Sequence, residues 1–119
     1  MKPEIYRQII DRLVEEARNG QGKIGPDRVI RGLWNQNATE DFIPEQHAMN
    51  QLLVALSTEQ RAVLARMLQD QFVCGVFETL KALEEFGIEP FVEGYEGSPY
   101  HDFIGRLDDD PWPWPDDPN

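Results

Sequence analysis

A phenol, an imidazole, a carboxylate and a guanidinium stand close together near the C-terminus of this sequence. They belong to Tyr100, His101, Asp102 and Arg106, which together with Tyr95 form the densest group of chemically capable side chains in the 119 residues. If the segment is helical, Asp102 and Arg106 form a surface ion pair four residues apart, which stabilises the helix by about 0.3–0.5 kcal/mol. If it folds over the core instead, the group lines a pocket for a small molecule or a reaction. The surface pair is the favoured interpretation, and the pocket remains an alternative.

The residue types that usually hold metals or act as nucleophiles are sparse and poorly spaced for either task. His47 and His101 are the only histidines, whereas a zinc site needs three or four ligands at regular spacing. Cys74, the only cysteine, lies in the apolar run Phe-Val-Cys-Gly-Val-Phe, which predicts a small buried side chain rather than an activated thiol. We therefore predict no catalytic residue, no metal site and no cofactor. A single cysteine cannot form an internal disulfide, which is typical of a reducing compartment.

An acidic segment rich in tryptophan and proline closes the sequence. Residues 89–119 hold nine acidic residues and one base, a net charge of -8, whereas residues 1–88 carry only -3. Trp112 and Trp114 alternate with prolines, so this part of the chain is predicted to be extended. The favoured interpretation is that both indoles pack on the protein's own surface. The alternative is recognition of a basic partner protein, because tryptophan is enriched at interface hot spots and acidic flanks attract cations.

The overall charge excludes two classes of partner. With 22 acidic and 11 basic residues, the chain has a formal net charge of -11. Neutralising the phosphates of nucleic acid, and adhering to an anionic membrane surface, both require clustered lysine and arginine. The sequence also lacks a long apolar run and a signal-type apolar stretch near its first residue. We therefore expect a cytoplasmic protein that binds neither nucleic acid nor membrane.

Hydrophobic residues recur at helical spacing through most of the chain, which predicts an all-α fold. The glycine-rich residues 20–25 predict a loop, and residues 57–60 match a capping box at the start of the longest helix. Ser98-Pro99 is a helix-start signal, with a pair of strands around residues 93–97 as the alternative. The predicted helices span residues 4–19, 26–35, 44–56, 58–86 and the short segment 98–107.

Helix 58–86 is predicted to be the centre of a compact four-helix domain. Around Cys74 it is apolar on nearly every side, which is typical of a helix surrounded by others. Gly75 is unfavourable in a helix interior by roughly 1 kcal/mol relative to alanine, so it predicts a close helix crossing or a kink. We assign residues 1–107 to the domain and residues 108–119 to an extended tail of proline, tryptophan and aspartate.

Two parts of the chain carry a family resemblance. The first is Leu56–Leu68 with the later Glu89-Pro90-Phe91, and the second is Tyr100–Leu107 followed by Asp110-Pro111-Trp112-Pro113. Over roughly residues 50–115 the sequence resembles a family of small uncharacterised bacterial proteins. The resemblance implies a bacterial, non-secreted and mostly helical domain, and it carries no activity or functional residue with it.

Three hypotheses about function follow from the sequence. The favoured one is a non-enzymatic interaction module that engages a basic protein through its acidic, aromatic C-terminal region, with Trp112 and Trp114 as contact residues. The second is a small-molecule-binding or enzymatic domain with a pocket around Tyr100, His101, Asp102 and Arg106. The third is a structural homodimer that meets its copy through the helix surface near Gly75 or Trp34.

Overall fold

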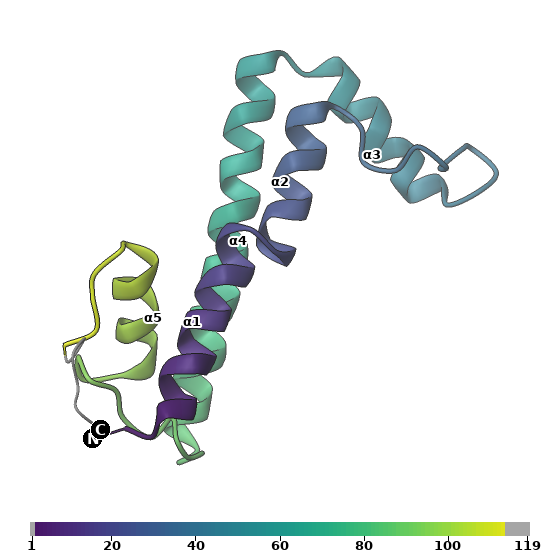
Figure 1. The fold of residues 1–119 in the computed structure, drawn as a ribbon. Coiled ribbons are helices and arrows are strands. Elements are labelled where there is room, and N and C mark those ends of the chain that lie inside the picture. Colours follow the sequence, from purple (N-terminus) through teal and green to yellow (C-terminus); the bar gives the residue numbers. More distant parts are fainter. Residues whose placement is uncertain (1, 114–119) are drawn as a thin grey trace.

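The computed structural model describes residues 2–113, and within this range the chain is built from helices (Figure 1). An isolated bridge between Gly94 and Gly97 is the one strand-like contact in the described residues. The predicted all-α class is therefore confirmed, and residues 93–97 form a turn rather than a pair of strands. The helices are α1 (Glu4–Arg18), α2 (Gln21–Arg31), α3 (Pro44–Ala55), α4 (Thr58–Glu85) and α5 (Pro99–Leu107).

The 28-residue helix α4 is the element against which α1, α2 and α5 pack. It begins at the predicted capping box: Ser57 Oγ accepts from the Gln60 N–H at 3.1 Å, and the Gln60 side chain accepts from the Ser57 N–H at 2.9 Å. It ends before Gly87, whose φ of 67° lies in the left-handed region that glycine adopts without strain. Figure 1 shows α1 along one half of α4 and α2 along the other half.

The start of α2 differs from the prediction, because residues 21–25 are helical and not a loop. Gly22 in this stretch serves close packing between helices. A Cβ on Gly22 would lie 2.7 Å from the Ala17 carbonyl oxygen and 2.8 Å from Phe72 Cδ1, so only glycine lets α2 approach α1 and α4 at this point. Pro26, expected at the first turn, lies inside the helix instead.

The main core lies where α1, α4 and α5 meet. Tyr6 and Ile10 of α1 and Phe103 of α5 are fully buried there, and Leu80 of α4 is 1 % exposed. A smaller cluster of Val29, Leu53 and Ala65 joins α2, α3 and α4. The two clusters explain why α5 and the end of α3 stay in place at opposite ends of α4.

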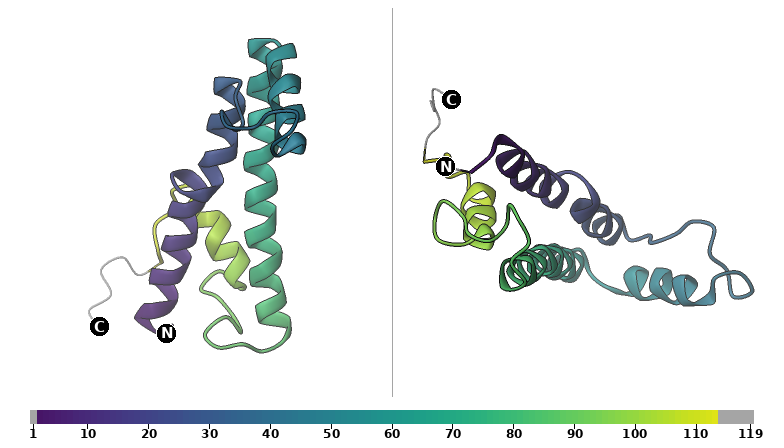
Figure 2. Two further views of the ribbon diagram at one scale, coloured as in Figure 1. Left: turned by 90° about the vertical axis from the view of Figure 1, so that its right-hand side faces the viewer. Right: turned by 90° about the horizontal axis from the view of Figure 1, so that it is seen from below.

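The outline of the protein is long and thin. Its extents are 56 × 27 × 19 Å and its radius of gyration is 18.1 Å, whereas a spherical domain of this length has about 13–14 Å. Figures 1 and 2 show why: α3 turns away from α4 at the end far from α5. As a result α4 is not enclosed, and the prediction of a buried Cys74 is wrong, because its side chain is exposed.

Candidate functional site

Asp102, one of the predicted site residues, is buried at the junction of α5 and α1, with 2 % of its surface exposed. Its Oδ2 accepts from the Tyr6 hydroxyl at 2.6 Å and from the Tyr95 N–H at 2.7 Å, and its Oδ1 accepts from the Glu96 N–H at 2.8 Å. Burial and the Asp102 carboxylate together raise the pKa of Tyr6 far above its ordinary value. Asp102 thus fixes the 94–97 turn and α5 onto α1.

Arg106 does not pair with Asp102, so the predicted surface pair is wrong. Its Nε donates to Asp11 Oδ1 at 2.9 Å and its Nη1 to the Asp110 carbonyl oxygen at 3.0 Å. The buried position of Asp102 explains the difference, since its oxygens already accept from three donors. Asp11 is the partner on α1 that anchors the guanidinium of Arg106.

Trp112 packs on the protein's own surface, as the favoured interpretation predicts. Its Nε1 donates to Asp11 Oδ2 at 3.1 Å, and the guanidinium of Arg106 lies 5.2 Å from the ring. The indole meets Tyr95 edge-on at 5.4 Å between centroids and lies 6.3 Å from Tyr6. Trp112 is therefore half-buried in an aromatic cluster, whereas Trp114 lies outside the described residues.

Arg18 holds the C-terminal end of α5. Its guanidinium donates to the carbonyl oxygens of Arg106 and Leu107 and to Asp109 Oδ1 at 2.7 Å. A cation at this position also stabilises the helix, because the last carbonyl groups of a helix carry partial negative charge. Residues 106–112 are thus fastened to α1 by Arg18 and Asp11.

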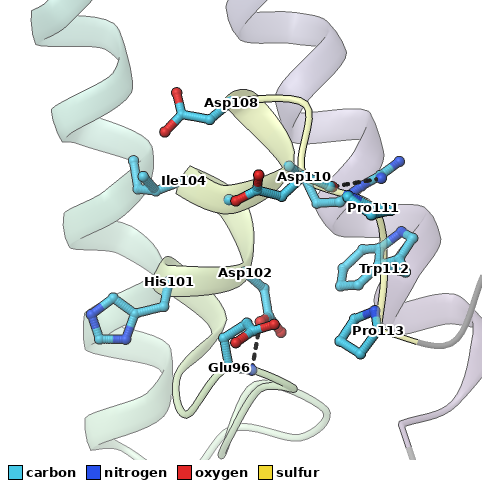
Figure 3. A pocket seen from close by; sticks show the side chains of 11 residues that line it. Glu96, His101, Asp102, Ile104, Asp108, Asp110, Pro111, Trp112 and Pro113 are labelled. Atoms are coloured by element: carbon cyan, nitrogen blue, oxygen red, sulfur yellow. Dashed lines mark hydrogen bonds between the residues drawn. The ribbon is translucent and has the colours of Figure 1, made fainter.

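A groove of about 470 Å³ lies between α5 and the segment that follows it (Figure 3). Carboxylates dominate its polar lining, and Glu96, Asp108 and Asp110 are exposed among them. The guanidinium of Arg106 also lines it but is neutralised by Asp11. The groove is lined by Glu96, His101, Asp102, Ile104, Gly105, Arg106, Asp108, Asp110, Pro111, Trp112 and Pro113.

The structure brings some of the predicted site residues together and separates others. Asp102, Arg106, Trp112 and His101 all line the groove, with His101 on the opposite side of α5 from Trp112 in Figure 3. Tyr100 does not line it, because its ring packs on Phe77 of α4 at 4.5 Å between centroids.

Sequence reasoning missed both partners that α1 contributes. Tyr6 and Asp11 precede Asp102 and Arg106 by more than ninety residues, and nothing in a single sequence marks such pairs. Glu96, Asp108 and Asp110 were visible only as part of the acidic composition.

Among the described residues, neither a metal centre nor a membrane-spanning helix is found. No group of three or more His, Cys, Asp or Glu side chains in residues 2–113 is arranged to hold a metal ion. None of the five helices combines the length and apolar character needed to cross a membrane.

Comparison with known proteins places the chain in a family. The model of a family of unknown function (DUF6547) matches residues 1–114, so the chain belongs to that family. The resemblance to uncharacterised proteins is thereby confirmed, and it extends beyond residues 50–115 to nearly the whole chain. No curated protein and no solved structure gives a significant match.

Proposed function

We propose that this member of the DUF6547 family is a non-enzymatic interaction module of the cytoplasm, which binds a basic segment of a partner protein in the acidic groove beside α5. The observation that carries the proposal is the arrangement of charge in that groove. Glu96, Asp108 and Asp110 present exposed carboxylates, while the one guanidinium in the lining is paired with Asp11. Lysine and arginine side chains are the protein groups that such a surface attracts.

The surroundings of the groove strengthen this attraction. Described residues 89–113 hold seven acidic residues and one base, a net charge of -6. A concentration of one sign of charge speeds association with an oppositely charged partner and makes binding sensitive to salt. Pro111, Trp112 and Pro113 form a wall that loses little conformational freedom on binding, which lowers the entropic cost of the complex.

The same geometry disfavours the enzymatic alternative. A general acid or base must have an atom free to exchange a proton with a substrate. Both oxygens of Asp102 already accept hydrogen bonds from the protein, and the guanidinium of Arg106 donates to Asp11 and Asp110. Tyr100 faces α4, so the four predicted residues do not converge on one point.

A charge-neutralising variant tests the proposal without disturbing the fold. The site variant replaces Glu96→Gln, Asp108→Asn and Asp110→Asn, three exposed side chains. A matched control replaces Glu78→Gln, Asp27→Asn and Asp70→Asn, which are also exposed and remove the same charge elsewhere. Truncation after Leu107 is a poorer test, because it also removes the contacts of Asp109 and Trp112 with α1.

Affinity is measured for a labelled arginine- and lysine-rich peptide at low salt by fluorescence polarisation. We expect the site variant to bind about tenfold more weakly, which corresponds to about 1.4 kcal/mol, and the control variant to keep most of its affinity. In lysate, the same partner should be captured by the control variant and lost by the site variant. Equal weakening of both variants would show that only the overall charge matters and would contradict a site in the groove.

A further inference from the structure

A polar groove of about 700 Å³ lies where α2 ends and the segment after it meets α3, far from α5 along α4 (Figure 1). Its volume is typical of sites for small molecules. No carboxylate of the described residues lines it, although the chain has 22 acidic residues. We name it the arginine groove. Its polar lining is formed by two arginines and four carboxamides: Arg28, Arg31, Asn35, Gln36, Asn37 and Gln46.

The two arginines of this groove are not neutralised by the described chain. The ion pairs found within residues 2–113 all use other arginines. Arg28 and Arg31 are three residues apart on α2, so they are neighbours on one face of the helix. Their positive charges therefore repel each other, and an anion bound between them would remove this repulsion.

Arg28 and the wall beside it are held in place before any ligand binds. The guanidinium of Arg28 lies 5.3 Å from the centroid of the Trp34 ring, a cation–π contact. Asn50 of α3 fixes the segment that carries Trp34. Its Oδ1 accepts from the N–H groups of Trp34 at 2.7 Å and Asn35 at 3.0 Å, and its Nδ2 donates to the Asn35 carbonyl oxygen at 2.7 Å. A wall fixed in this way loses little conformational freedom on binding.

Three of the four carboxamides keep hydrogen-bonding groups for a ligand. Asn35 uses both ends of its side chain, because its Nδ2 donates to Gln46 Oε1 at 2.7 Å and its Oδ1 accepts from the Asn37 N–H at 2.9 Å. Within the part of the chain that the structure describes, no hydrogen bond uses the side-chain amides of Gln36 and Asn37 or the Nε2 of Gln46. A carboxamide both donates and accepts, which matches the hydroxyl groups of a ligand.

The charge of the groove favours a phosphomonoester over a carboxylate. A phosphomonoester carries about -1.5 to -2 at pH 7 and has three acceptor oxygens, enough for two guanidinium groups, whereas a carboxylate carries a single charge. Guanidinium groups bind phosphate oxygens through paired N–H donors. Because the whole chain carries -11, it repels a long polyanion, which favours a small ligand.

We propose that the arginine groove binds a small hydroxylated phosphomonoester of the sugar phosphate class. The phosphate group lies between Arg28 and Arg31, and the hydroxyl groups bind Gln36, Asn37 and Gln46. The site shares no lining residue with the acidic groove beside α5, so it does not depend on the binding of a basic partner there.

The first test is an NMR titration of the full chain with glucose 6-phosphate, inorganic phosphate and glucose at one ionic strength. We expect glucose 6-phosphate to bind with a dissociation constant of about 1 mM or lower, inorganic phosphate to bind about tenfold more weakly, and glucose to have no effect. The signals of residues 28–37 should shift. Shifts from neither phosphate compound, or equal shifts from glucose, would overturn the proposal.

A charge-matched pair of variants tests the two arginines. Arg28→Gln combined with Arg31→Gln should weaken glucose 6-phosphate binding at least about tenfold. The control combines Arg66→Gln with Lys81→Gln, which removes the same charge at exposed positions of α4 and should keep the affinity. Equal weakening in the two variants would contradict a site in the groove. Circular dichroism checks both folds, because cations in the last turn of α2 also stabilise that helix, and Arg31→Gln alone is the second disruption if the double variant unfolds.

The carboxamides are tested by comparing two ligands on one variant. Gln36→Ala combined with Asn37→Ala should weaken glucose 6-phosphate binding towards the level of inorganic phosphate and leave the affinity for inorganic phosphate unchanged. An unchanged affinity for glucose 6-phosphate would overturn the assignment of the hydroxyl groups to these amides. A phosphoserine peptide that binds the wild type more tightly than glucose 6-phosphate would overturn the assignment to a small hydroxylated ligand.

Discussion

Helices α1 and α4 form a pair with two faces, one covered by the rest of the described chain and the other open. On one face, α5 and its flanking residues cover Tyr6, Ile10 and Leu80 so completely that each is at most 1 % exposed. On the other face, Ile9, Leu13 and Leu83 line an open apolar groove that the described chain does not cover. Figure 2 shows α5 beside the pair, with α3 at the far end of the molecule.

The difference lies in polar side chains that act over long distances in sequence. The covered face is closed by Asp102, Asp11 and Arg18, which connect α1 with residues 95–112 through hydrogen bonds and ion pairs. The open face has Ile9, Leu13 and Gly75 in its groove, which offer apolar surface but no charge. The first face is completed by contacts within the described chain, whereas the second is left open by it.

Removing the Asp102 carboxylate should lower the free energy of unfolding more than any other substitution of a hydrogen-bonding side chain on the covered face. Asp102→Ala leaves the Tyr6 hydroxyl and the N–H groups of Tyr95 and Glu96 without their acceptor. We expect a loss of about 3 kcal/mol or more in the free energy of unfolding, because each orphaned donor costs about 1–3 kcal/mol. Urea unfolding followed by circular dichroism measures this loss.

A control substitution on the solvent side of α4 tests whether the loss of stability is specific to Asp102. Asp70 is exposed, so Asp70→Ala should change the free energy of unfolding by less than about 0.5 kcal/mol. Similar losses for the two variants would mean that the covered face is not held by the Asp102 network.

Removing only the Tyr6 hydroxyl should have a smaller effect. Tyr6→Phe keeps the ring in the aromatic cluster and deletes the hydrogen bond to Asp102. A hydrogen bond to a charged group contributes about 1.5–3 kcal/mol, so we expect a loss in that range at neutral pH by urea unfolding. A loss as large as that of Asp102→Ala would instead assign the whole network to this one bond.

The raised pKa of Tyr6 also predicts that the stability of the fold depends on pH in the alkaline range. Burial and then the bond to Asp102 raise the pKa of Tyr6 in the folded protein above its ordinary value of 10.0. The unfolded chain therefore releases this proton above pH 10 while the folded chain keeps it, so the stabilisation is present below pH 10 and declines as the pH rises further. The stability difference between wild type and Tyr6→Phe should shrink above pH 10 by up to about 1.4 kcal/mol per pH unit. A difference that stays constant there would contradict the raised pKa.

The sequence predicts the helices well where local signals decide them. The Ser57–Gln60 capping box and the Ser98-Pro99 start both occur where predicted. The prediction is wrong where contacts with residues distant in the sequence determine the local structure or burial. Gly22 suggested a loop because a single sequence does not show that α1 and α4 will press on it, and Cys74 suggested burial although no helix covers it.

The candidate site was predictable only in composition. The excess of acidic residues after residue 88 was visible, and so was the self-packing of Trp112. The roles of Asp102 and Arg106 were not, because they depend on Tyr6 and Asp11 at the other end of the chain. Pairing between α1 and α5 is a property of the tertiary fold.

The smallest change tests whether the open face is open at Gly75. Gly75→Ala adds one methyl group at a position where the described chain leaves space, since a Cβ there would meet no other atom within 4 Å. The substitution should stabilise the fold by about 1 kcal/mol, because alanine is the better helix former. Thermal unfolding measures this gain. A loss of stability would show that the added methyl group meets another part of the protein and that the face is covered at this glycine.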